Sequence, residues 1–131
     1  MPKYCLDTNY LLRYILNDIP SQADEVVQIL ELASEGKAVC FVSIVVQMEV
    51  FFTLSTFYDY NKNDIYKIMT NIYNMVFLDF EYAETMRIAL EIYLDKSLSI
   101  QDSFLIAFSK TEKMELKTFD KKALKAFQNL S

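Results

Sequence analysis

Short apolar runs alternate along this chain with longer segments of helical spacing. The short runs have the length and composition of buried β-strands. In the longer segments, apolar residues recur every three or four positions, which indicates helices. Strands are expected at residues 4–6, 38–42, 75–78 and 115–119. Helices are expected at residues 10–16, 21–35, 44–57, 62–73, 80–94, 99–113 and 121–128.

This alternation predicts an α/β fold, with a short parallel four-stranded sheet flanked by about seven helices. Parallel strands need crossover connections, and helical crossovers cover both faces of the sheet. The chain has 131 residues and 53% hydrophobic residues, which is ample for one core. With no repeat, low-complexity tract or linker, we expect one domain over residues 1–131.

Polar residues mark several helix starts, because their side chains accept hydrogen bonds from the first turn. Residues of this type stand at or just before the start of five expected helices, Asn9, Ser21, Ser43, Ser99 and Asp120, and Asn61 or Asn63 can cap the helix expected at 62–73. Gly36 is the only glycine in the chain. It follows the second helix, where a residue in the left-handed conformation commonly ends a helix.

The chain contains no histidine and only two cysteines, Cys5 and Cys40. This excludes a Cys/His zinc site, Ser-His-Asp and Cys-His triads, and nucleases with a histidine base. Both cysteines lie in strand-like runs, and we expect them to be reduced core residues of a cytosolic protein. Any catalysis must use carboxylates, hydroxyls, amines or a bound metal.

No apolar run approaches the ~20 residues that span a bilayer. Residues 1–3 lead directly into the first expected strand, so we expect no signal peptide and no membrane partner. These features favour a cytoplasmic location.

The charge is unevenly distributed. The net charge of −5 taken alone argues against nucleic acid as a partner. Residues 110–131 carry six lysines against three acids, a net of +3, and the remainder carries seven basic and fifteen acidic residues, a net of −8. Divalent cations held by acidic side chains would neutralise or reverse the negative charge locally.

Four carboxylates follow expected strands or begin expected helices: Asp7, Glu49, Asp102 and Asp120. In a parallel sheet, the strand ends and the following helix starts lie at one edge, so these four side chains could meet. Clustered carboxylates repel one another, and Mg²⁺ or Mn²⁺ would relieve that repulsion. Two such ions about 4 Å apart can stabilise both the attacking and the leaving oxygen of a phosphodiester displacement.

Each of these acids also has a purely structural interpretation. Asp120 alone fits an N-cap, and Asp102 alone fits the third position of a capping box with Ser99. Asp7 alone is as compatible with a turn as with a site. Glu49 is hardest to explain structurally, because its helix is rich in Met and Phe and is expected to be mostly buried. Single positions favour structure, whereas the joint pattern favours a site.

At these residues the chain resembles the PIN-domain family, and within it the small VapC-like toxins of toxin–antitoxin pairs. Four segments carry the resemblance, in the family's order: residues 6–13 (LDTNYLLR), 43–49 (SIVVQME), 100–107 (IQDSFLIA) and 117–122 (KTFDKK). The third segment commonly has an extra acid three residues before its Asp, where this chain has Ser99. That departure makes a site with one metal plausible.

The resemblance implies a metal-dependent endoribonuclease that uses Mg²⁺ or Mn²⁺ to cleave RNA. It implies metal-binding and catalytic roles for the four acids and supporting roles for the polar residues Thr8, Asn9 and Thr118. It also implies a homodimer and a cognate antitoxin that blocks the site.

Two other functions remain open from the residues alone. In a non-catalytic PIN-like protein-binding module, the acids would be helix caps and exposed aromatic helices would contact a partner. In a phosphatase with Asp7 as nucleophile, a second acid is usual two residues later. Asn9 occupies that position, which makes the phosphatase the weakest of the three hypotheses.

Overall fold

The computed structural model describes residues 1–130, which contain three short strands and seven helices. The strands are β1 (Lys3–Cys5), β2 (Val39–Val42) and β3 (Asp79–Phe80). The helices are α1 (Thr8–Leu16), α2 (Pro20–Ser34), α3 (Ile44–Thr56), α4 (Lys62–Tyr73), α5 (Ala83–Lys96), α6 (Ile100–Thr111) and α7 (Lys121–Asn129). The predicted α/β class, parallel sheet and number of helices are confirmed.

The three strands are parallel and lie in the order β1-β2-β3. Tyr4 of β1 lies opposite Cys40, and Phe41 of β2 lies opposite Asp79. The central strand β2 buries its inward side chains, whereas two of the three side chains of β1 are exposed. Cys40 is therefore buried as predicted. The prediction that Cys5 is a core residue is wrong, because Cys5 is exposed on the edge strand.

The prediction of four strands is wrong in two places. Residues 75–78 form a tight turn, closed by a hydrogen bond from the Leu78 N–H to the Met75 carbonyl (3.0 Å), and β3 follows this turn. Residues 115–119 form no strand, and no backbone–backbone hydrogen bond joins them to any part of residues 1–130. A parallel strand requires a neighbouring strand edge, and no such edge lies beside this link between α6 and α7.

Several predicted helix caps are confirmed, because their side chains accept a hydrogen bond from the first turn: Ser43, Ser99 and Asp120. Gly36 takes the left-handed conformation, with φ of 72°. Asn9 is not an N-cap, because α1 already begins after Asp7, which caps it. Ser21 is not one either: α2 begins at Pro20, whose ring fixes the φ that a first helical residue needs.

A buried amide joins α3 to the end of the sheet. Gln47 is fully buried, and its Nε2 donates to the carbonyls of Val42 (3.1 Å) and Glu81 (2.9 Å). Its Oε1 accepts a hydrogen bond from the Tyr73 hydroxyl (2.8 Å), whose pKa is raised by burial. The Glu81 carboxylate in turn accepts from the Ile44 N–H (2.8 Å). The amide has partners for both its donor and its acceptor, so it is buried without an unsatisfied polar group.

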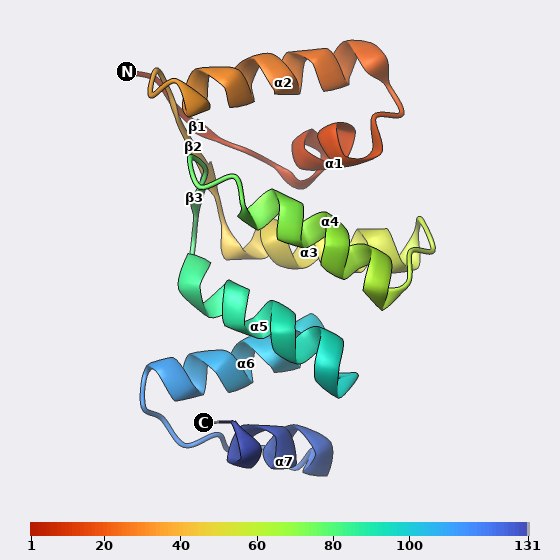
Figure 1. The fold of residues 1–131 in the computed structure, drawn as a ribbon, viewed down its shortest axis with the longest axis vertical. Helices are drawn as coiled ribbons and strands as arrows, with labels where there is room; N and C mark the ends of the chain where they lie inside the picture. The colour runs from red at the N-terminus through yellow and green to blue at the C-terminus, as the bar shows by residue number, and fades with distance from the viewer. Residues whose placement is uncertain (131) are drawn as a thin grey trace.

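Figure 1 shows the helices as successive layers along the long axis of the molecule. Helices α1 and α2 lie with β1 at one end, α3 and α4 follow, then α5 and α6, and α7 lies at the other end (Figure 1). The two chain ends lie towards opposite ends of the molecule. We call β1–β3 with α1–α4 the sheet region (residues 3–80), and α5–α7 the helical region (residues 83–129).

Lys62 of α4 joins the two regions. Its ammonium group donates to the carbonyl of Tyr93 (3.0 Å) and to that of Leu98, and lies 4.0 Å from the centroid of the Tyr93 ring. Burial lowers the pKa of Lys62, and the neighbouring charge of Lys122 lowers it further. The edge of Tyr93 also meets the Phe51 ring of α3, with 5.3 Å between centroids. These contacts join the helical region to the α3–α4 layer, and one hydrophobic core continues through both regions.

No helix within residues 1–130 is both long enough and apolar enough to cross a membrane.

Candidate functional site

Asp7 lies where β1 ends and α1 begins. Its Oδ1 accepts a hydrogen bond from the Tyr10 N–H (2.8 Å), which is the capping bond of α1, and the residue is exposed. This capping bond uses only one of the two carboxylate oxygens of Asp7. Asp7 and Asn9 line a hollow of about 290 Å³ together with Arg13 and Glu25. A small polar group could therefore approach the Asp7 carboxylate.

Glu49 reaches the start of α1 from the second turn of α3. The Thr8 hydroxyl donates to Glu49 Oε2 (3.0 Å), so that one contact links the first segment of the resemblance to the second. The expectation that Glu49 stands in a mostly buried setting is wrong, because its side chain is exposed. Helix α3 buries the face that carries Gln47, Phe51 and Leu54, and Glu49 lies off this face.

Asp102 and Asp120 lie at the starts of α6 and α7. The Asp102 N–H donates to Ser99 Oγ (3.1 Å), which is the cap bond expected of a capping box, and its side chain is half-buried. Asp120 Oδ1 accepts from the backbone N–H groups of Lys122 (2.9 Å) and Ala123 (3.0 Å). Thr118 Oγ1 accepts from the Asp120 N–H (3.0 Å), so Thr118 supports the turn that presents Asp120.

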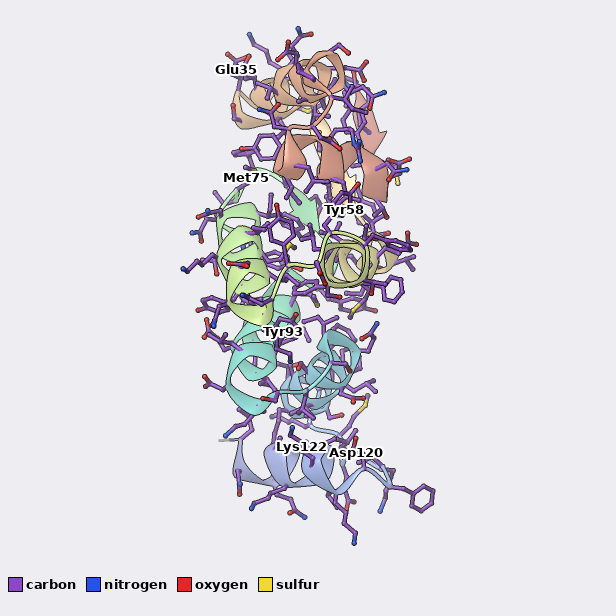
Figure 2. The ribbon with its side chains drawn as sticks, turned by 90° about the vertical axis from the view of Figure 1, so that its right-hand side faces the viewer. Glu35, Tyr58, Met75, Tyr93, Asp120 and Lys122 are labelled. Atoms are coloured by element: carbon purple, nitrogen blue, oxygen red, sulfur yellow. The ribbon has the colours of Figure 1, made fainter. Side chains whose placement is uncertain are left out.

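The four acids divide into two pairs. Asp7 and Glu49 belong to the sheet region, whereas Asp102 and Asp120 begin helices of the helical region. Figure 2 shows Asp120 and Lys122 at the α7 end of the molecule, and Glu35, just after α2, at the opposite end. In the described part of the chain, no three Asp, Glu, His or Cys side chains are grouped so that they could hold a metal ion. The described residues of this conformation therefore contain no ready-made metal cluster of three such ligands, and the meeting of the four acids stays a prediction.

Tyr10 and Glu25 lie beside Asp7, which the sequence pattern does not predict. The Tyr10 hydroxyl donates to Glu25 Oε2 (3.0 Å), and both residues line the two hollows that include Asp7. Partial burial, with Glu25 as the second cause, raises the pKa of Tyr10 to about 12. Glu25 lies far from the acid motifs in sequence. Only the packing of α1 against α2 brings it near, and that packing was not inferred from the residue pattern.

One comparison with known proteins identifies the family. The family model of the PIN domain matches residues 4–129 and therefore includes all four acids and the polar residues next to them. No curated protein matches the chain significantly, and neither does any solved structure. Because the match leaves out only the first three and the last two residues, the chain belongs to the PIN-domain family.

Proposed function

We propose that this protein is a metal-dependent endoribonuclease that hydrolyses RNA phosphodiester bonds. PIN domains are generally metal-dependent nucleases, and membership in that family is the observation that carries the proposal. Asp7, Glu49, Asp102 and Asp120 are the proposed metal-binding and catalytic residues. Thr8, Asn9 and Thr118 are proposed as supporting groups. The hydrogen bonds from Thr8 to Glu49 and from Asp120 to Thr118 agree with such supporting roles for the two threonines.

The four acids have the chemistry of Mg²⁺ or Mn²⁺ ligands, but their arrangement in the described part of one chain does not form a group that could hold such an ion. Carboxylate oxygens are the ligands that Mg²⁺ and Mn²⁺ favour, and each pair of acids is positioned by helix starts. Within residues 1–130 of one chain, however, no group of three possible ligands is formed. The residues of a single chain in this conformation therefore do not fit a shared metal ion, and the proposed activity requires the two pairs to come together.

The biological role that we propose is that of the toxin in a toxin–antitoxin pair. This includes a cytoplasmic location, a homodimer and an antitoxin that covers the acids. The proposal rests on the resemblance of the four motif segments to VapC-like toxins.

The test is cleavage of a mixed RNA pool by the purified protein. We expect cleavage with Mn²⁺ or Mg²⁺, none with a chelator, and none by Asp102→Asn, because Asp102 is a proposed metal ligand. Asp95→Asn is the matched control: Asp95 is an exposed acid in the last turn of α5, and its variant should cleave like wild type. Equal trace activity in wild type and Asp102→Asn would mean contamination and would contradict the proposal.

A non-catalytic protein-binding module is the second candidate. It is favoured by the capping bonds, because helix capping alone accounts for the observed bonds of Asp7 and Asp120. This candidate predicts a folded protein that neither binds Mn²⁺ nor cleaves RNA.

A further inference from the structure

A hollow lies between α3 and the start of α6, where the sheet region meets the helical region. Its volume is about 290 Å³, at the small end of the range for ligand pockets, which suits a single flat ring system. We call it the α3–α6 hollow. Its lining includes Tyr93, which Figure 2 shows where the α3–α4 layer meets the α5–α6 layer.

This hollow lies beside two of the proposed metal ligands. Glu49 and Phe52 are three residues apart on α3 and both are exposed, so they share one face of that helix. Gln101, which lines the hollow, directly precedes Asp102 in the first turn of α6. An RNA strand held by its phosphate at these acids would therefore carry a neighbouring base past the hollow.

Phe52 places an aromatic ring at the hollow. Its side chain is 54% exposed, although the Phe57 ring meets it at 79° with 6.2 Å between the centroids. The half-buried Tyr60 supplies a second ring to the lining. Bases of single-stranded RNA stack on exposed aromatic side chains, because every base has an aromatic face. The hollow therefore has a surface on which a base can stack.

The polar groups of the hollow also suit a base. Within the described residues, Lys62 is the one charged residue in its lining, so the lining holds no carboxylate that would repel RNA. The hollow beside Asp7 differs, because Glu25 adds a second acid there. The Gln101 amide is exposed at the hollow and offers both a hydrogen-bond donor and an acceptor to the edge of a base.

We propose that the α3–α6 hollow binds one base of the RNA substrate next to the phosphate that is cut, with the base stacked on Phe52 and its edge bonded to the Gln101 amide. The base must be unpaired, because a paired base is not free to turn into the hollow. This inference rests on the proposed function, and it assigns part of the choice of cleavage position to this hollow.

Tryptophan fluorescence tests the base site without any use of nuclease activity. The chain contains no tryptophan, so Phe52→Trp introduces a single reporter and keeps an aromatic ring at the hollow. The variant is titrated with a short single-stranded RNA of mixed sequence, once with a chelator and once with Mg²⁺. We expect saturable quenching, because a stacked base quenches the indole. Phe77→Trp is the matched control: Phe77 is 38% exposed, lies in the turn before β3 and lines another hollow beside α2, and its variant should show little quenching.

Cleavage kinetics separate a role in binding the base from a role in the chemistry. Phe52→Leu keeps an apolar side chain but removes the aromatic face, so we expect KM to rise about tenfold with little change in kcat. Phe77→Leu is its control and should leave both constants unchanged. Gln101→Leu should reduce the difference in cleavage between RNAs that differ only in the base beside the cut. An unchanged KM in Phe52→Leu would contradict stacking on Phe52.

The fluorescence result decides the inference. Quenching of Phe52→Trp no stronger than that of Phe77→Trp, in both conditions, would overturn the base site, whether or not the wild type cleaves RNA. Saturable quenching in a protein that cleaves no RNA would support the base site and contradict the proposed nuclease. The failure of the inference and the failure of the proposed function are therefore distinguishable.

Discussion

The sheet region and the helical region each carry two of the four acids and share one hydrophobic core, but their polar contacts are of different kinds. In the sheet region, backbone pairing and the neutral Gln47 amide fix α3 to the sheet, and the amide is satisfied on both sides. The helical region contains no strand, and a charged, partly buried Lys62 binds it to α4 through backbone carbonyls. The comparison shows that each acid pair lies on its own set of elements, so a site made of all four acids would depend on how the two regions pack together.

Replacing Gln47 by Leu should produce the largest loss of stability. The substitution leaves the Glu81 carbonyl and the Tyr73 hydroxyl without their amide partner in a buried setting. We expect the free energy of unfolding to fall by about 3 kcal/mol, since unsatisfied buried groups cost 1–3 kcal/mol each. Urea unfolding measures this. Gln28→Leu, on the exposed side of α2, is the control and should change stability by less than about 0.5 kcal/mol. Equal losses in both variants would show that the amide network contributes nothing.

Replacing Lys62 by Met should have a smaller effect, concentrated in the helical region. The carbonyls of Tyr93 and Leu98 lose a charged donor, but methionine keeps the apolar contact with the Tyr93 ring. We expect a loss of about 1–2 kcal/mol. Amide hydrogen exchange should increase in α5 and α6 more than in β2. Lys67→Met, on the exposed side of the same helix, is the control. A uniform increase across β2, α5 and α6 would contradict a role for Lys62 in holding the helical region.

The smallest effect concerns the titration of Tyr10 and appears only at high pH. Its pKa is raised from 10.0 to about 12, so the folded protein keeps this proton where the unfolded chain has lost it. The corresponding stabilisation is present below pH 10 and is lost as the pH rises towards about 12. The ultraviolet difference titration between wild type and Tyr10→Phe should show one tyrosinate that forms late. In the Glu25→Gln background it should form at lower pH, because the neighbouring carboxylate is removed. An unchanged titration would mean that Glu25 does not act on Tyr10.

Local features of the fold could be predicted from the sequence, whereas features that depend on distant partners could not. The caps Ser43 and Ser99 were predictable, because each bonds within its own first turn. Whether residues 115–119 form a strand could not be predicted from their own pattern. The segment has the alternation of a strand, but pairing depends on whether an edge lies beside it.

The same distinction between local features and features that depend on distant partners applies to the candidate site. The acids themselves could be recognised within the motif segments, and the family match includes all of them. The exposure of Glu49 was missed because α3 is apolar around most of its circumference, so its sequence does not reveal which face is buried. The partnership of Tyr10 and Glu25 depends on the packing of α1 on α2, which no local pattern encodes.

The most direct test of a nuclease site built from both regions compares two single variants, Asp7→Asn and Asp120→Asn, with the wild type. Asn also caps helices, so both variants should fold. We expect each variant to lose Mn²⁺-dependent cleavage that the wild type retains, because each removes one proposed metal ligand. Cleavage retained by either folded variant would contradict a role for its region in the site, and an inactive wild type would contradict the nuclease itself.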